Sequence, residues 1–408
     1  MIALGLGAAT ERFAAELAEP QSCAPSWTDF GWRMAHAAAV LHGVTPLLAG
    51  TLRWSGPQSW QIILSEQRRQ TCLRYERIAA VLDAIDDRAT HAGLAAVALK
   101  GAALHTLGVY APGERPMADI DLLVREADEE RACALLESVS YVQTGASWKH
   151  RIFTPVQADA GARAWQATVK ALPLGEHADH PVKIELHTRI AERLPLAEVA
   201  ITELVLPRQP RPGLNAYPST HALLLHLLLH AAGNLCGRQL RLIHLHDLAR
   251  LAAPLTAWDW RELFGLLPAS QAPWWALAPL AMLNRYQPAL VPDAILAQLR
   301  RICPRPLRRL SRHATLSQMS LASVSVPAFP GLAWCTSHAA RLQYVRERIF
   351  PGPEQMASRR CLAAEQWAMQ HAWTHMSQAR RMRRWLFGRP TRQGSMHIAQ
   401  AALQQPLP

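Results

Sequence analysis

The stretch Val97–Val124, VALKGAALHTLGVYAPGERPMADIDLLV, joins the end of one apolar run to a second apolar run through a glycine-containing segment. The first run, Leu94–Leu99, leads into Lys100 and Gly101, and the second covers Ile120–Val124. Short apolar runs bounded by turn residues are typical of buried strands. The intervening segment begins with a helical pattern. The sequence therefore predicts a strand, a short helix and a second strand.

Asp119 and Asp121 stand on either side of Ile120 at the start of the second predicted strand. Residues i and i+2 of an extended strand point to the same face, so both carboxylates face one site while Ile120 and Leu122 enter the core. Two carboxylates this close repel each other at neutral pH unless a cation lies between them. Mg²⁺ is the first candidate and Mn²⁺ the alternative. The spacing alone is a weak signal, since solvated edge residues and turn caps share it.

A third carboxylate comes from Val182–His187, VKIELH, which alternates apolar and polar residues and predicts a half-buried strand. Glu185 lies on the polar face of this strand. If the two strands are neighbours, Glu185 completes a two-metal site with Asp119 and Asp121. Such a site activates a hydroxyl and stabilises the leaving group during in-line phosphoryl transfer.

The surrounding sequence predicts helices before this core and after it, and a poorly patterned insertion between Val156 and Pro181. Apolar periodicity predicts helices at Asp29–His42, Trp60–Asp86 and Glu126–Val139, and again along most of the chain after Pro218. Strand fragments are predicted at Tyr141–Val142 and Arg151–Phe153. The expected fold is α+β. A small mixed-sheet core at 90–205 is flanked by largely helical regions at 1–89 and 206–408.

The composition sets limits on the class of protein. The chain has 408 residues, a formal net charge of +12 and 50% hydrophobic residues, which excludes wholesale disorder. Its 7 cysteines are scattered without a C-x-x-C pair, which argues against a disulfide framework or a thiolate zinc site. The longest apolar runs are broken by His or Pro, and the N-terminus lacks the basic region of a signal peptide. We expect a cytoplasmic protein without a membrane span.

Arginine is abundant from about Arg300 onward, in RRICPRPLRRLSR and again in ARRMRRWLFGRPTR. Solvated helix faces are the simpler explanation, and attraction of nucleic acid, an acidic peptide or a membrane surface is the functional one. Within Arg380–Arg392 the arginines of a helix would span two sides, so some of them meet solvent or a partner. Truncation before Arg380 is expected to weaken binding of an acidic acceptor.

The order of these motifs resembles the nucleotidyltransferase fold of the DNA polymerase β superfamily. LKGAAL, RPMADIDLLV and IELH are more closely similar to a broad bacterial family of uncharacterised nucleotidyltransferases. Some members of that family occur in gene clusters for lasso peptides and exopolysaccharides. The resemblance covers about Trp27–Ala253. Where the superfamily usually has Gly-Ser or Gly-Gly after the first strand, this chain has Lys100 and Gly101.

The resemblance implies a set of residue roles and a reaction. Asp119, Asp121 and Glu185 would be catalytic and hold the metal. Nucleotide binding would fall to Lys100, Gly101 and Arg115, of which Arg115 would hold a phosphate or fix its loop. The implied reaction is Mg²⁺-dependent transfer of a nucleoside monophosphate from an NTP, with ATP as the first candidate, to an acceptor hydroxyl or phosphate. The acceptor would be a small molecule, a protein or a peptide natural product.

Two alternatives of other kinds remain open. One is a binding or scaffold protein that keeps the fold without turnover, against which the intact carboxylates count. The other is a tRNA-directed nucleotidyltransferase toxin, which the arginine-rich segments after Arg300 favour. Salt-sensitive RNA binding would support this alternative.

The histidines of the C-terminal half have a simpler explanation than metal binding. His226 and His230 have the i, i+4 spacing of zinc proteases, but Leu227 occupies the position of the general base, so we interpret both as helix-face residues. For Asp247, which follows His246, we predict a structural bond to a neighbouring element. P-loop, Rossmann and G-x-S-x-G motifs are absent from the sequence.

Overall fold

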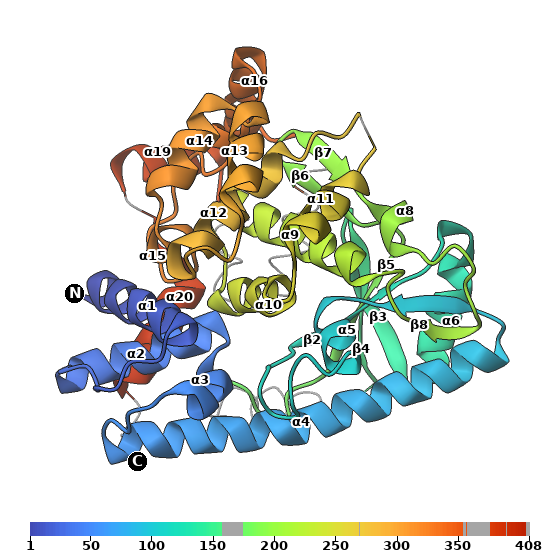
Figure 1. Ribbon diagram of the computed structural model, residues 1–408, viewed down its shortest axis with the longest axis horizontal. Coiled ribbons are helices and arrows are strands. Elements are labelled where there is room, and N and C mark those ends of the chain that lie inside the picture. Colours follow the sequence, from blue (N-terminus) through green and yellow to red (C-terminus); the bar gives the residue numbers. More distant parts are fainter. Residues whose placement is uncertain (157–173, 269, 354–355, 357–375, 389, 405–408) are drawn as a thin grey trace.

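The computed structural model describes residues 1–156, 174–268, 270–353, 356, 376–388 and 390–404. The N-terminal part consists of helices α1 (Ile2–Ala18), α2 (Asp29–His42), α3 (Thr45–Thr51) and α4 (Gln58–His91). The predicted helices at 29–42 and 60–86 are confirmed, and the second extends further at both ends. With 34 residues, α4 is about 50 Å long and runs along one side of the sheet (Figure 1).

Six strands form one mixed sheet in the order β3-β4-β5-β2-β1-β8. The strands are β1 (Ala95–Ala98), β2 (Asp119–Leu123), β3 (Tyr141–Ala146), β4 (His150–Pro155), β5 (Lys183–His187) and β8 (Gly213–Asn215). Two helices and one turn of 3-10 helix connect them: α5 (Lys100–Thr106), η1 (Glu126–Asp128) and α6 (Glu129–Ser138). This mixed sheet between helical regions confirms the expected α+β class.

The two faces of the sheet pack against different parts of the chain. Ile120 and Ile184 point into a core formed with α4 and α6. Val97 and Leu123 belong instead to the larger core that includes the C-terminal helices. Because side chains alternate along a strand, Asp121 shares the face of Leu123. The carboxylates therefore lie on the side of the sheet that faces the C-terminal helices.

The C-terminal helical region begins after β8 with α9 (Thr220–Cys236), an almost wholly buried helix whose N-terminus is capped by the Ser219 side chain. It continues through α10 (Leu242–Ala252), α11 (Ala257–Gly265), η2 (Trp274–Ala276), α12 (Leu277–Tyr286), α13 (Asp293–Ile302), α14 (Arg305–His313), α15 (Leu316–Met319), η3 (Leu332–Trp334), α16 (His338–Ile349), α19 (Gln378–Phe387) and α20 (Gln393–Gln404). None of the described helices combines the length and apolar character that a membrane span requires.

The last helix, α20, returns to the N-terminal region and packs against α2 (Figure 1). Arg33 of α2 donates hydrogen bonds to the carbonyl oxygens of Ala402 and Leu403, at 3.3 and 3.0 Å. Ala399 and Ala402 are buried in the same core as α1 and α2. The two ends of the described chain therefore stabilise each other.

Three strands were not expected from the sequence. β6 (Ala191–Leu194) and β7 (Ala197–Ala200) form a separate hairpin, followed by the short helix α8 (Thr202–Val205). β8 pairs in parallel with β1 although it lies beyond residue 205, where the α/β core was expected to end. Most of the unpatterned insertion expected at 156–181 lies outside the described residues.

Candidate active site

The predicted carboxylates come from two neighbouring parallel strands. β2 and β5 pair in a register that sets Asp119 opposite Lys183 and Asp121 opposite Glu185. The two strands thus bring Asp121 and Glu185 side by side on the face that looks toward α9. Asp119 shares that face, one pleat nearer the start of β2.

Asp121 is held in its ionised form by two partners. Its Oδ1 accepts hydrogen bonds from Lys100 Nζ at 2.7 Å and from His187 Nε2 at 3.0 Å. Burial alone would raise the pKa of this carboxyl, but the charge of Lys100 and the hydrogen bond from His187 hold its pKa well below the ordinary value. Asp121 is therefore ionised at neutral pH and accepts hydrogen bonds from both partners.

Asp119 lacks such partners. In the described part of the chain its carboxylate makes no hydrogen bond and no ion pair. Burial and the neighbouring charges of Asp121 and Glu185 raise the pKa of Asp119 to about 7. This excess of negative charge is the condition in which a carboxylate site attracts a cation.

Glu185 lies between two histidines that were not singled out in the sequence. Its Oε2 is 3.4 Å from His150 Nδ1 and 3.6 Å from His187 Nε2. The alternation of VKIELH already placed His187 on the face of Glu185. His150 had no comparable signal, because only the pairing of β4 with β5 sets it opposite His187.

Lys100 has a left-handed backbone conformation, with φ of 46°, which is uncommon for a residue with a side chain. Its N–H donates to the Tyr217 hydroxyl at 3.3 Å, and that hydroxyl lies 2.7 Å from Nδ1 of His226. The next residue, Gly101, has no room for a side chain. A Cβ there would lie 2.6 Å from Nη1 of Arg115 and 2.8 Å from Sδ of Met117.

Arg115 forms a buried ion pair with Asp247 of α10. Its Nε and Nη2 donate to the two carboxylate oxygens of Asp247 at 2.8 and 2.7 Å. The Tyr110 hydroxyl donates to the same carboxylate at 2.8 Å. All three side chains are buried. The structural bond predicted for Asp247 is confirmed. The contact of Arg115 with Asp247 is compatible with a loop-fixing role, and its part in nucleotide binding stays a prediction.

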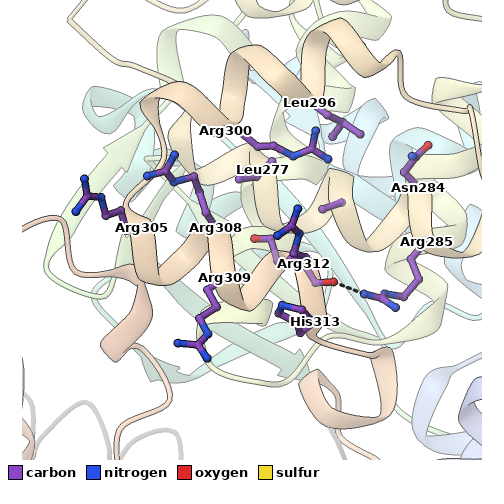
Figure 2. Close-up of a pocket in the computed structure, with 12 residues that line it drawn as sticks. Leu277, Asn284, Arg285, Leu296, Arg300, Arg305, Arg308, Arg309, Arg312 and His313 are labelled. Atoms are coloured by element: carbon purple, nitrogen blue, oxygen red, sulfur yellow. Dashed lines mark hydrogen bonds between the residues drawn. The ribbon is translucent and has the colours of Figure 1, made fainter.

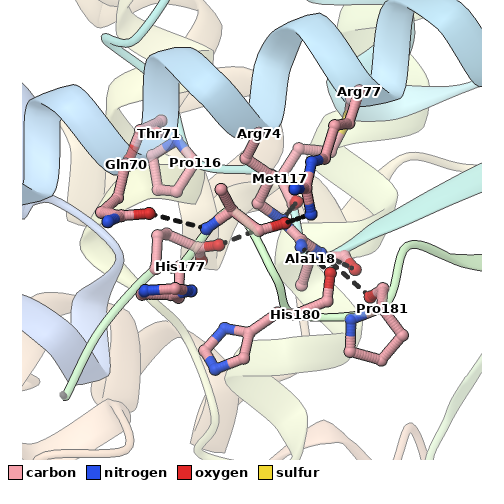
Figure 3. Close-up of polar contacts among 12 residues, drawn as sticks. Gln70, Thr71, Arg74, Arg77, Pro116, Met117, Ala118, His177, His180 and Pro181 are labelled. Atoms are coloured by element: carbon pink, nitrogen blue, oxygen red, sulfur yellow. Dashed lines mark hydrogen bonds and ion pairs between the residues drawn. The ribbon is translucent and has the colours of Figure 1, made fainter. Parts of the chain in front are cut away.

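A buried arginine of α4 fixes the segments that precede β2 and β5 (Figure 3). The Arg74 guanidinium donates to the carbonyl oxygens of Met117 and Ala118, both at 2.9 Å, just before Asp119. It also donates to the carbonyl oxygens of His180 and Pro181, at 2.6 and 3.2 Å. One side chain therefore sets the relative position of the two carboxylate-bearing strands, and nothing in the local sequence pattern indicated it.

A pocket of about 130 Å³ opens beside the carboxylates, between β4, β5 and α9. Its polar lining includes Lys100, Lys149, His150, Glu185, Glu192 and His230. Lys149 and Glu192 form an ion pair at 2.6 Å. His226 and His230 of α9, predicted as helix-face residues, also line this pocket; burial lowers the pKa of both well below the ordinary value.

A second, larger pocket of about 860 Å³ lies between α12, α13 and α14, remote from the sheet (Figures 1 and 2). Six arginines line it: Arg285, Arg300, Arg305, Arg308, Arg309 and Arg312. Among the described residues no ion pair joins any of them to a carboxylate. The sequence contains no Asp or Glu between Asp293 and Glu347. The pocket therefore presents uncompensated positive charge on an apolar floor that includes Leu277 and Leu296.

A mixed sheet with carboxylates on two adjacent strands is suited to phosphoryl-transfer chemistry. The model of a family described as "Uncharacterised nucleotidyltransferase" matches residues 28–303. The chain belongs to this uncharacterised nucleotidyltransferase family, and it is a nucleotidyltransferase by that membership. Comparisons with curated proteins and with solved structures gave no significant match.

Proposed function

We propose that this protein transfers a nucleoside monophosphate from an NTP, with ATP as the first candidate, to a hydroxyl or phosphate of an acceptor in a Mg²⁺- or Mn²⁺-dependent reaction. Family membership supports nucleotide transfer in general. The observation that supports the residue roles is the shared face of Asp119, Asp121 and Glu185, where Asp119 forms no ion pair with a described residue and its pKa is raised.

The side chains of the site would have separate roles in metal binding and phosphate binding. Asp119, Asp121 and Glu185 would hold the divalent ion, which when bound lowers the pKa of an attacking hydroxyl and offsets charge on the phosphates. Lys100 keeps Asp121 ionised, and its amine borders the pocket, where it can also bind a phosphate oxygen. The Tyr217 hydroxyl, which also contacts His226, accepts a hydrogen bond from the backbone N–H of Lys100 and so fixes the backbone of this residue.

The acceptor is proposed to be anionic. The pocket of six arginines has the charge to bind phosphates or carboxylates, because the guanidinium group pairs with both through two parallel hydrogen bonds. A modified peptide natural product is the first candidate, given the gene clusters in which similar proteins occur. A tRNA acceptor is the second candidate, favoured by the same arginines.

The experiment is label transfer. The purified protein is incubated with each α-³²P-labelled NTP, with Mg²⁺ or Mn²⁺, and with acidic peptides or tRNA, and the acceptor is then separated and counted. Transfer is expected in the wild type and lost in Asp119→Asn and in Asp121→Asn. Asp83→Asn, an exposed position on α4, is the matched control. Undiminished transfer in either active-site variant contradicts the assignment.

A further inference from the structure

His150 and His187 flank Glu185, and together they form a cluster that brings two imidazole groups to one carboxylate of the site. One ligand atom of each lies within 4.8 Å of the other two. The two strands that carry them are antiparallel neighbours, with His150 opposite His187 and Ile152 opposite Glu185. We propose that these three side chains bind a divalent transition-metal ion, Zn²⁺ in preference to Mg²⁺, at the wall of the pocket.

The distances fit a metal ion better than they fit hydrogen bonds. A tetrahedral Zn²⁺ with bonds of about 2.0–2.1 Å holds its ligand atoms about 3.3 Å apart. The two histidine nitrogens lie 3.4 and 3.6 Å from Glu185 Oε2. Nδ1 of His150 is buried and makes no hydrogen bond with any described residue. A buried nitrogen without a partner is costly, and coordination of an ion would satisfy it.

The type of ligand sets the choice of ion. Mg²⁺ prefers oxygen ligands in an octahedral arrangement, whereas imidazole is a ligand suited to zinc and other transition metals. Two histidines and one carboxylate leave a coordination position open, as in catalytic zinc sites. The three side chains line the pocket, so this position would be available to water or to a substrate oxygen.

Asp121 competes with the ion for His187. His187 Nε2 currently contacts Asp121 Oδ1 at 3.0 Å, so it must give up this contact to bind the metal. Asp121 would remain neutralised by Lys100 at 2.7 Å. Glu185 belongs to this site and to the carboxylate site, so the ion would lie next to the proposed reaction. A chemical role of the ion rests on the proposed function, whereas binding of the ion does not.

The binding test uses the full chain, freed of metal with a chelator and without nucleotide. Co²⁺ is titrated while its visible absorption bands are recorded, and Zn²⁺ and then Mg²⁺ are added as competitors. We expect one Co²⁺ per chain with bands of a four- or five-coordinate ion, displaced by an equivalent of Zn²⁺ and retained in excess Mg²⁺.

The variants assign the site. His150→Ala and His187→Gln should each weaken Co²⁺ binding by about tenfold or more. His221→Ala is the matched control, because His221, Asp259 and Glu262 form the other three-residue group of this kind among the described residues, at the surface. It should leave the affinity of the pocket site unchanged. His150→Ala removes no hydrogen bond of Nδ1, so its fold should be retained even if that of His187→Gln is not.

Each outcome is informative. Equal Co²⁺ affinity in the wild type and His150→Ala overturns the proposal, as does displacement by Mg²⁺ at equal concentration. Loss of the signal in His221→Ala alone would place the ion at the surface and also overturns it. If label transfer occurs but the protein binds neither Co²⁺ nor Zn²⁺, the proposed transition-metal site is wrong and the proposed function stands. Binding without any label transfer refutes the proposed function and leaves the site intact.

Discussion

At the scale of single residues, the site combines a fully stabilised carboxylate with one that is not. Asp121 has Lys100 and His187 as partners. Asp119 is half-buried beside other carboxylates and makes no hydrogen bond or ion pair with a described residue, and its pKa is raised to about 7. The folded protein therefore retains a proton on Asp119 more readily than the unfolded chain does. This contribution to stability is present at acid pH and is lost as the pH rises through about 7.

We therefore predict that Asp119→Asn stabilises the metal-free protein while it abolishes nucleotide transfer. The amide carries no charge, so the free energy of unfolding at pH 8 should rise by about 1–3 kcal/mol. Urea unfolding at pH 8 and at pH 4 measures this effect, and the difference from the wild type should shrink at pH 4. A variant that is less stable than the wild type at pH 8 would show that Asp119 has a counter-charge in the folded protein.

A second prediction at this scale separates Lys100 from Arg115. Lys100→Ala should weaken NTP binding, because it removes a cation at the edge of the pocket. Arg115→Ala should instead lower the free energy of unfolding by about 3–5 kcal/mol, because it leaves Asp247 charged and buried without its partner. Urea unfolding and equilibrium NTP binding are measured on both variants. Unchanged stability with weaker NTP binding in Arg115→Ala would return Arg115 to the role of a phosphate ligand.

At the scale of elements, α4 is more than a cover for the sheet. Through Arg74 it binds the backbone directly before β2 and directly before β5, so it aligns the strands that carry Asp119 and Glu185 (Figure 3). These carbonyl groups belong to irregular segments, where no ladder of backbone hydrogen bonds satisfies them. A guanidinium group can serve several acceptors at once because of its planar arrangement of donors.

We predict that Arg74→Lys lowers the free energy of unfolding by about 2–4 kcal/mol, since an ammonium group cannot replace all of these charge-assisted hydrogen bonds. It should also lower kcat more than it changes KM for the NTP, because the strands would lose their alignment without losing a ligand. Arg77→Lys, on the same helix but half exposed, is the control and should cost less than about 1 kcal/mol. Equal effects of the two substitutions would remove the special role of Arg74.

At the scale of the whole molecule, the pocket of six arginines lies apart from the face of the sheet that carries the carboxylates. Helices α12, α13 and α14, which line the arginine pocket, lie apart from the sheet (Figure 1), whose strands β2 and β5 carry the carboxylates. Figure 2 shows the arginines of the pocket. Truncation before Arg380 is not a clean test of the basic regions. It removes α20, whose buried alanines complete the core with α2, so loss of stability is expected as well.

Substitution inside the arginine pocket is the better test. The triple variant Arg305→Gln, Arg308→Gln, Arg309→Gln should raise KM for an acidic acceptor without changing KM for the NTP. Added salt should reduce the difference from the wild type, because it screens exposed charges. Arg301→Gln, an exposed arginine of α13 outside the pocket lining, is the control. If the triple variant and the control behave alike at low salt, the pocket does not bind the acceptor.

The local pattern of the chain was sufficient to predict the main elements and the common face of the first two carboxylates. Alternation with period 2 places Asp119 and Asp121 together, and places Glu185 with His187, whatever the strands pack against. The strands β1, β2 and β5 and the helices α2 and α4 were predicted for the same reason: their apolar spacing is a property of neighbouring residues. The catalytic role of these side chains stays a prediction.

The contacts between distant segments depended on the tertiary structure. Arg115 and Asp247 are 132 residues apart, and Lys100 and Tyr217 are 117 apart. The pairing of β4 with β5, which brings His150 to Glu185, and the parallel pairing of β8 with β1 also join distant parts of the chain. These contacts are selected by the burial of two separate apolar cores on the faces of the sheet. Such burial is a property of the whole packed chain, so no local spacing reveals it.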